Sequence, residues 1–462
     1  MADTIAARKA PNPWWVAVVC GMASYIDAAT IVATGIALVI YQQTIGVTPT
    51  EIGIMSGSLT LCIAIGAVFG GRLGDRFGRR AVFLVTMALV AVGIAFLVFS
   101  TAFPLLLTGV ILAGLGTGAD LPVSLSTISE AATDRNRGAL IGLSNILWSV
   151  GILVPVALSI FAGGWGRFGG QVLFAQIGVV AIAVLLCRLA IPESPFWKQA
   201  HVERTEGIRT IRADKAGVRD LLKAPYAVPF LALLVFYALT NVGANTGGQF
   251  GTYLAVNVAH IPVQLNSLIG LLSFPLGILF GVWFMKIVDG RSRMVYFVIG
   301  AVALLLGYVT PAAFGFNVVT IVLMNLFMAF GGAFAFEGIM KVWTQESFPT
   351  LLRSSAQGTI IAVARVVAAL LAFVTPALVA VSAQGLYWCL AVVVAIGLLV
   401  AWFAFRRGRS NQFDHEQELD PDARTEAPGF VATAAPASVA TEAPASVATA
   451  APARDTTAAP TA

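Results

Sequence analysis

Long apolar runs separated by short polar breaks follow one another through most of the 462-residue chain. A helix needs about 20 apolar residues to cross the roughly 30 Å hydrocarbon core of a bilayer. Twelve runs in this sequence reach that length. The composition agrees, with 58% hydrophobic and 11% charged residues and a mean hydropathy of +0.86. We therefore expect an all-α membrane protein with twelve transmembrane helices.

The runs divide the chain into two sets of six. They occupy residues 14–40, 52–72, 81–99, 104–129, 138–162, 171–190, 228–256, 265–287, 294–312, 318–343, 356–381 and 385–405. The expected domains are an N-terminus (1–13), a six-helix bundle (14–190), a central loop (191–227), a second six-helix bundle (228–405) and a tail (406–462). The tail is rich in Ala and Pro and almost repeats residues 435–442 as 443–450, which predicts disorder.

The glycine-rich, charged segment Gly70–Arg80 separates the second run from the third. A nucleotide-binding loop of similar composition would follow a strand and open a helix, where backbone N–H groups can hold phosphate. This segment lies instead between two runs that are long enough to span a membrane. We interpret it as a loop at the membrane surface.

Charged residues near this loop recur in the second half of the chain at an offset of about 215 residues. Asp75 with Arg79 returns as Asp289 with Arg293, and Glu130 with Arg137 returns as Glu346 with Arg353. A shared offset indicates a duplicated half. The fold class expected is therefore two pseudo-symmetric six-helix bundles.

Lys and Arg lie in alternate loops, with Arg167 as the exception. Loops rich in positive charge stay on the cytoplasmic side, so we expect a multi-pass plasma membrane protein with both termini in the cytoplasm. The net charge of +5 then reflects topology and not binding to nucleic acid. The first run is too long for a signal peptide and carries Asp27, so no cleavage is expected.

Three segments resemble one transporter family. Gly71–Arg80 fits Gly-x-x-x-Asp-Arg-x-Gly-Arg-Arg, the pattern between helices two and three of the major facilitator superfamily. Pro192–Trp197 after the sixth run, and Glu346–Thr350 with Arg353 after the tenth, resemble its sugar porter branch and the related metabolite:proton symporters. The resemblance covers residues 14–405. It implies a secondary transporter that acts by alternating access and functions as a monomer.

Ionisable residues inside the spans are candidates for the transport pathway, because their burial in lipid is costly. Asp27 shares a helix face with Ser24 and Thr34. In proton-coupled sugar porters an acid of the first helix accepts the proton, and Asp27 matches its location. The alternative is a structural carboxylate satisfied by a neighbouring helix.

Asp120 and Ser124 form a second polar stripe, in the fourth run. Asp120 is either a second proton site or a cap for the backbone hydrogen bond that Pro122 breaks. Sugar porters usually have an arginine next to the position of Gly109, where this chain has Val110. This departure weakens the transfer of their proton-coupling pair.

Amides supply the expected substrate contacts. Asn145, with Trp148 close to its face, stands where many sugar porters have a sugar-contacting glutamine. Asn241, Asn245 and Gln249 follow at successive steps of four residues and form a stripe on one helix. Hydrogen bonds between helices are the alternative role for these amides.

Glu337 and Lys341 lie one helical turn apart in the tenth run, and we expect them to form an ion pair. Arg365 in the eleventh run could recognise a carboxylate or pair with Glu337 or Asp120. Lys341 also replaces a tryptophan that stacks on sugars in the sugar porters. An organic anion therefore competes with a sugar as the substrate.

Loop residues form the expected conformational gate, since they resemble the cytoplasmic salt bridges that close when such a transporter faces outward. The set is Gly71, Asp75, Arg79, Glu130, Arg137, Asp289, Arg293, Glu346 and Arg353. A solvated, positively charged face is the alternative. Two Gly-x-x-x-Gly pairs, Gly66 with Gly70 and Gly277 with Gly281, predict close helix packing.

The function expected from these features is transport of a small polar metabolite (a sugar, polyol or organic acid), by proton symport. The alternatives are a proton-coupled efflux antiporter and, outside transport, a nutrient sensor. The sequence offers no phosphate loop, His-Glu-x-x-His pattern or paired nucleophile and base, so we expect no enzyme activity, cofactor or metal. The partners expected are the substrate, protons and the lipid bilayer.

Overall fold

The computed structural model describes residues 12–131, 137–191, 221–223, 226–287, 292–348 and 350–406, and these contain helices and no strand. Most of the central loop and the tail predicted to be disordered lie outside these residues. So do Asp289, the surroundings of Gly71, and the side chains of Asp75, Arg137, Asn145 and Arg353. Residues 1–414 form one compact unit and residues 415–462 a second, of which nothing is described.

Six helices make up the first half of the chain. They are α1 (Pro13–Ile45), α2 (Pro49–Phe77), α3 (Arg79–Phe99), α4 (Phe103–Ala131), α5 (Arg137–Ala162) and α6 (Arg167–Leu189). Their ends follow local sequence signals. Gly46 ends α1 with a φ of 76°, which glycine adopts without strain. Thr48 and Glu51 then form a capping box at the start of α2.

The second half begins after the central loop. Its helices are α8 (Ala227–Asn257), α9 (Val263–Ile287), α10 (Arg293–Phe314), α11 (Val318–Ala335), α12 (Glu337–Ser347) and α13 (Thr350–Phe405). The tenth predicted span is broken at Phe336, whose φ of −132° and ψ of −126° are not helical. The eleventh and twelfth spans form α13, which bends at Ser382.

Ten described helical segments are long and apolar enough to cross a membrane. The 56 residues of α13 are sufficient for two crossings, and α5 adds another apolar helix. The described helices are thus consistent with the twelve predicted spans.

The predicted loop Gly70–Arg80 is mostly helical. α2 continues through Phe77, and Gly78, with a φ of 96°, is the single residue between α2 and α3. The prediction of a glycine-rich loop was wrong here. Charged residues at a membrane surface continue a helix as readily as they end it.

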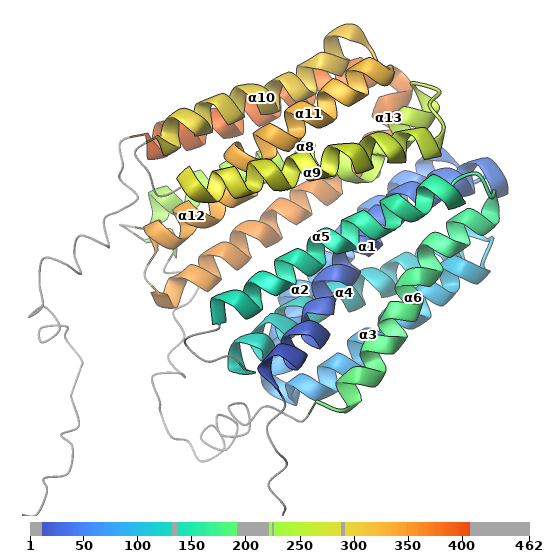
Figure 1. The fold of residues 1–462 in the computed structure, drawn as a ribbon, viewed down its shortest axis with the longest axis vertical. Coiled ribbons are helices and arrows are strands. Elements are labelled where there is room, and N and C mark those ends of the chain that lie inside the picture. The colour runs from blue at the N-terminus through green and yellow to red at the C-terminus, as the bar shows by residue number, and fades with distance from the viewer. Residues whose placement is uncertain are drawn as a thin grey trace, which may run out of the picture. The chain divides into compact units, whose positions relative to one another are not determined.

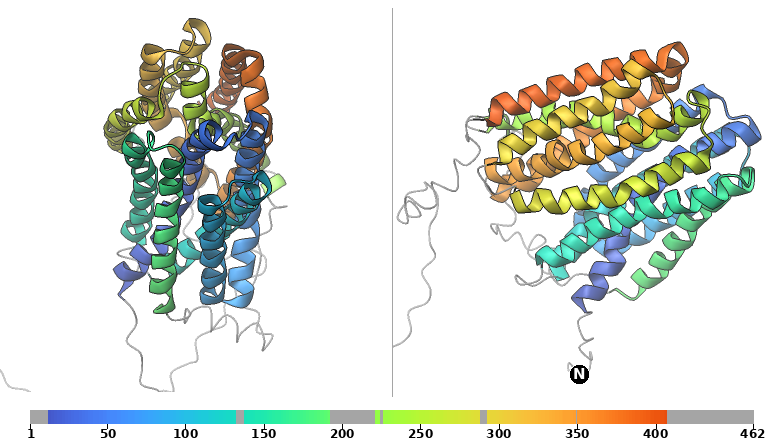
Figure 2. Two further views of the ribbon diagram at one scale, coloured as in Figure 1. Left: turned by 90° about the vertical axis from the view of Figure 1, so that its right-hand side faces the viewer. Right: turned by 45° about the horizontal axis from the view of Figure 1, so that its top comes forward.

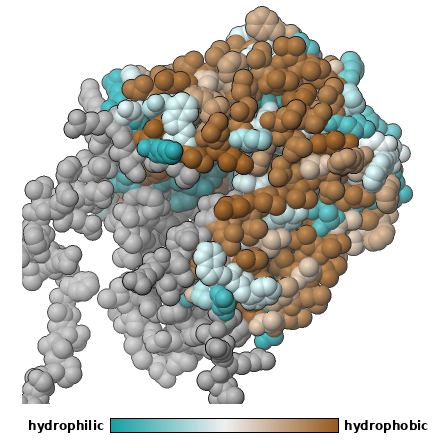
Figure 3. All heavy atoms as spheres, in the orientation of Figure 1, coloured by the Kyte–Doolittle hydropathy of each residue, from teal (hydrophilic) through white to brown (hydrophobic). Residues whose placement is uncertain are grey.

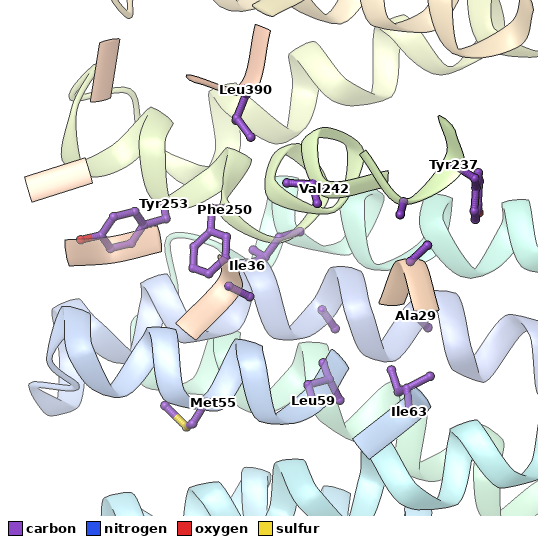
Figure 4. Packing of buried hydrophobic residues seen from close by; sticks show 14 of the residues in the cluster. Ala29, Ile36, Met55, Leu59, Ile63, Tyr237, Val242, Phe250, Tyr253 and Leu390 are labelled. Carbon is purple, nitrogen blue, oxygen red and sulfur yellow. The ribbon is translucent and has the colours of Figure 1, made fainter. Parts of the chain in front are cut away.

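Contacts between the two halves gather toward the loops at residues 46–48 and 258–262. α5 runs beside α9 and α2 beside α13 (Figures 1 and 2). A Cβ on Gly35 of α1 would lie 2.7 Å from the backbone oxygen of Gln249 in α8. Figure 4 shows Phe250 of α8 close to Ile36 of α1, with Leu59 of α2 below them in that view. The halves are thus packed closely at this end.

Apolar side chains cover much of the molecule's surface. They spread over both halves in Figure 3, and hydrophilic residues are concentrated near the helix ends at the right of that view. Large exposed side chains such as Val179, Ile182 and Leu272 lie well inside their helices. This distribution fits helices that face lipid.

One of the two Gly-x-x-x-Gly predictions is confirmed. A Cβ on Gly66 or Gly70 would lie 2.6 Å or less from a backbone oxygen of α4, so α2 and α4 approach closely. At Gly277 and Gly281 of α9 a Cβ would meet no atom of the described residues within 4 Å. The prediction of close packing there was wrong, because the spacing alone does not supply a neighbour.

Candidate functional site

An ion pair between the two halves lies near the middle of the helices. Arg365 of α13 donates from Nη2 to Oδ2 of Asp27 in α1 over 3.4 Å. The Asp27 side chain is 1% exposed and its Oδ1 has no partner among the described residues. The Arg365 side chain is 23% exposed. The sequence had suggested Glu337 or Asp120 as the ionic partner of Arg365, and the structure places Asp27 there.

The break at Phe336 brings a second ion pair to this level. Lys341 Nζ lies 2.7 Å from Glu337 Oε1, which confirms the expected pair. Both side chains remain open to solvent, at 37% and 40% exposed, so the site is accessible and not a packed core. Glu337, Arg365 and Tyr237 of α8 are close enough to interact electrostatically.

Tyr237 and Phe336 were not predicted as site residues. Their rings stack at a centroid distance of 5.5 Å and an interplanar angle of 26°. The non-helical backbone at Phe336 turns its ring toward α8 and starts α12 at Glu337. Gly331, Gly332 and Gly338 lie near this break, but no Gly or Pro stands at Phe336 itself, so the sequence does not place the break there.

The predicted amide stripe of α8 divides in two. Asn241, half-buried, lies beside Tyr237, and its Oδ1 has no described partner. Asn245 is half-buried one turn further on. Gln249 donates instead to Thr60 Oγ1 of α2 over 2.5 Å and is buried. Gln249 therefore joins the two halves, which corresponds to the interhelical alternative.

Other predicted substrate contacts take different places. Ser24 is buried against Ser144 of α5, with 3.2 Å between their Oγ atoms. Trp148 is exposed and shares a helix face with Ile152. Ile152 lines a cavity of about 270 Å³ that also contacts Gly247 and Asn325 of the second half.

Asp120 is paired with Arg188 of α6, a residue that the sequence analysis overlooked. Both terminal nitrogens of Arg188 donate to the two carboxylate oxygens of Asp120, one of them over 2.8 Å. Thr86 and Ser124 donate to the same carboxylate, over 2.9 and 3.1 Å. Arg188 also lies over the Phe83 ring, 4.3 Å from its centre. An arginine inside an apolar run was the signal that could have revealed this pair.

This cluster is closed to solvent, since Asp120 and Arg188 are 0% and 1% exposed. Ser124, predicted as a substrate contact, belongs to it and is also buried. The many hydrogen bonds around Asp120 account for the stripe of polar residues in α4. The arrangement holds α3, α4 and α6 together.

Two pairs of the predicted gate are formed, one in each half. Arg79 Nη2 lies 3.0 Å from Glu130 Oε1, and Arg293 Nη1 lies 2.5 Å from Glu346 Oε1. Each pair joins the start of one helix to the end of another, α3 to α4 and α10 to α12. The repeated geometry agrees with the shared offset in the sequence.

The chemistry available in the described residues is that of ion pairs, amides and aromatic rings. No group of three or more His, Cys, Asp or Glu side chains there could hold a metal ion. A partly open set of opposite charges between two helix bundles can bind a small polar molecule. It can also exchange a proton at a carboxylate.

Residues 17–376 match the Major Facilitator Superfamily, and the chain belongs to this family. It is therefore a membrane transporter and not an enzyme.

Curated relatives align with most of the chain. It is 29% identical over 395 residues to the minor myo-inositol transporter of Bacillus subtilis, covering 83% of this chain and 90% of the relative. It is 27% identical to the niacin transporter of Acinetobacter baylyi, with 69% of this chain and 76% of that protein aligned. Among solved structures, a D-xylose-proton symporter aligns with a TM-score of 0.69 at 18% identity, over 84% of this chain and 97% of that one.

Proposed function

We propose that this transporter moves one small polar metabolite across the plasma membrane by alternating access, in symport with a proton carried by Asp27. The observation that carries the proposal is the Asp27–Arg365 pair. It joins the two halves near the middle of the helices, and the acid is buried with one oxygen unpaired. A proton bound to Asp27 changes the charge of the site and weakens the ion pair that joins the two halves.

Asp120 is a structural carboxylate in this proposal. Its two oxygens already accept hydrogen bonds from Arg188, Thr86 and Ser124, and no solvent reaches it. A proton carrier has to meet water from each side in turn. Asp27 is paired with the partly exposed Arg365, which also lies close to Glu337, whereas the pair that Asp120 forms is closed to solvent.

The relatives support a small polar substrate. Their names include myo-inositol and niacin, a polyol and an aromatic acid, and one solved neighbour is a sugar-proton symporter. Arg365, Lys341 and Asn241 could bind hydroxyl or carboxylate groups. The pairs Arg79–Glu130 and Arg293–Glu346, each within one half, would shape the surfaces that meet when the cytoplasmic side closes, with both termini in the cytoplasm.

The test is accumulation in proteoliposomes with an imposed pH gradient, with myo-inositol, D-xylose and nicotinate as probes. Wild-type protein should concentrate one of these probes when the outside is acidic. Asp27→Asn should abolish this accumulation and retain exchange of labelled for unlabelled substrate, while Asp27→Glu should recover part of the accumulation. Accumulation by Asp27→Asn at the wild-type level would overturn the assignment of the proton site. Proton-driven extrusion in the same vesicles would identify an antiporter.

A further inference from the structure

Two arginines inside the spans, Arg188 and Arg365, differ in how many of their hydrogen-bond donors are paired. Arg188 bonds Asp120 with both terminal nitrogens, adds a bond to Ser124 and covers the Phe83 ring. Among the described side chains Arg365 makes one hydrogen bond, at 3.4 Å. Ionic hydrogen bonds of this type are normally about 2.7–2.9 Å long. Arg365 therefore keeps donors available, and part of its guanidinium is open to solvent.

The hydrogen bonding of the Asp27 carboxylate is equally incomplete. Its Oδ1 is buried with no described partner, although an ionised carboxylate has about four acceptor sites. Arg365 of α13 is the described charge that pairs with it, while Glu337 and Lys341 of α12 pair with each other and Tyr237 of α8 is neutral. α2 and α5 carry charged residues only near their ends, and in α4 and α6 Asp120 and Arg188 neutralise each other.

We propose that the substrate is a small monocarboxylate, and that its carboxylate replaces that of Asp27 on Arg365 when Asp27 takes up a proton. This rests on the proposed proton-coupled transport and names its substrate class. The proton comes from solvent and binds the Asp27 carboxylate, which becomes neutral. Arg365 then donates to the substrate carboxylate. No covalent bond other than O–H forms, and on release the proton and the acid leave together.

The charge balance makes the coupling obligatory. The empty site contains the Asp27 carboxylate and the Arg365 guanidinium, which sum to zero. The loaded site contains a neutral Asp27, the guanidinium and the substrate carboxylate, which also sum to zero. A site with only the proton or only the substrate has a net charge, and enclosing that charge in a medium of low polarity during reorientation is unfavourable. The empty and fully loaded forms are therefore the ones that reorient.

The aromatic pair favours an acid that carries a ring. Phe336 stacks on Tyr237 and is itself half-buried, so part of its ring remains uncovered beside the charged groups. A planar ring can pack on such a surface while its carboxylate reaches Arg365. The charges of Glu337 and Lys341 neutralise each other, which leaves Arg365 as the group that receives the anion.

Binding by purified protein tests the exchange directly. The probes are nicotinate, benzoate and 3-(3-hydroxyphenyl)propionate, each measured beside its neutral amide. Wild-type protein should bind at least one acid at low pH and none of the amides. Its affinity should fall by about tenfold per pH unit once Asp27 has lost its proton. Arg365→Gln should weaken acid binding by at least about tenfold, as expected for the loss of a charged hydrogen-bond partner.

Asp27→Asn gives the sharper result. Without a competing carboxylate Arg365 is always available, so this variant should bind the acid with the same affinity from pH 5 to pH 8. At pH 8 it should bind at least about tenfold more tightly than wild type. Arg167→Gln is the matched control, since it removes a positive charge outside the site, and should leave the affinity unchanged. Equal or weaker acid binding by Asp27→Asn at pH 8 would overturn the exchange.

Transport distinguishes failure of this inference from failure of the proposed function. Symport of one proton with one monocarboxylate carries no net charge, so a membrane potential set with valinomycin should not change uptake. Protein-free liposomes and Arg365→Gln vesicles set the background, because protonated weak acids also cross lipid unaided. Proton-driven accumulation of myo-inositol or D-xylose without any of the acids would reject the monocarboxylate and keep the proposed function. Accumulation of no probe would reject both.

Discussion

The two halves of the molecule pack corresponding helices with opposite chemistry. In the first half Cys20 of α1 and Phe83 of α3 lie beside the ion pair that Asp120 of α4 forms with Arg188 of α6. In the second half the matching helices supply an aromatic cluster: Phe236, Phe297, Trp343 and Phe405. Phe83 and Phe297 are separated by the same offset of about 215 residues that relates Arg79 to Arg293.

This difference shows that pseudo-symmetry preserves a packing requirement and not a residue type. The aromatic cluster holds its helices through ring contacts, with Trp343 stacked on Phe405 at 4.5 Å and 9°. The ion pair holds its helices through directed bonds, and it excludes any arrangement that leaves either charge unpaired. A buried charge pair that solvent does not reach is therefore structural, whereas the partly open Asp27–Arg365 pair is suited to exchange.

The largest effect on stability is expected from removing one partner of the Asp120–Arg188 ion pair. Arg188→Leu leaves the Asp120 carboxylate buried without its cation, which should lower the free energy of unfolding by about 3–5 kcal/mol. The measurement is thermal unfolding in detergent, together with the yield of folded protein. The double variant Arg188→Leu with Asp120→Leu should recover most of the loss, because apolar residues can replace such a pair. A double variant as unstable as the single one would show that the charges themselves are required.

Loss of the Trp343 ring, at the centre of the aromatic cluster in the second half, should lower the free energy of unfolding less than Arg188→Leu does. Trp343→Leu keeps an apolar side chain but removes the stack on Phe405 and the edge contacts with Phe236 and Phe297, for an expected loss of about 2 kcal/mol. Trp343→Phe is the control and should cost less than about 1.5 kcal/mol. The indole nitrogen has no described hydrogen-bond partner, so no bond is lost. The same unfolding assay applies, and a larger loss for Phe than for Leu would contradict the aromatic interpretation.

The gate pairs should affect rate more than stability. Arg79 and Arg293 occupy equivalent places near the helix ends, and their side chains keep 11% and 19% of their exposure, so losing either pair should cost less stability than losing the fully enclosed Asp120–Arg188 pair. We expect Arg79→Gln and Arg293→Gln each to slow maximal uptake several-fold with KM unchanged, because the pairs lie far from Asp27. Initial rates over a range of substrate concentrations measure this. Exchanging the charges, as in Arg293→Glu with Glu346→Arg, should restore part of the rate, and a changed substrate preference would argue against a gate.

The sequence was sufficient for most of the helices, because hydrophobic length is set by the bilayer and is local. The break at Phe336 and the helical course of Gly70–Phe77 were missed, since neither has a local signal that outweighs its neighbours. For the site, Asp27, Glu337 and Arg365 could be predicted from the cost of charge in a membrane. The pairing of Asp27 with Arg365 could not, because 338 residues separate them and only tertiary packing decides it.

The smallest effect is expected at Gly277, one of two Gly-x-x-x-Gly positions at which the halves differ again. Gly277→Ala in α9 adds a methyl group that meets no atom within 4 Å. It also removes a residue that lowers helix stability, so the free energy of unfolding should stay equal or rise by up to about 1 kcal/mol. Gly66→Ala in α2 is the counterpart. Its methyl group would lie 2.6 Å from the Leu115 backbone oxygen, which should cost about 1–3 kcal/mol. Thermal unfolding of both variants gives the comparison, and a loss at Gly277 as large as at Gly66 would mean that α9 packs against a helix at this position after all.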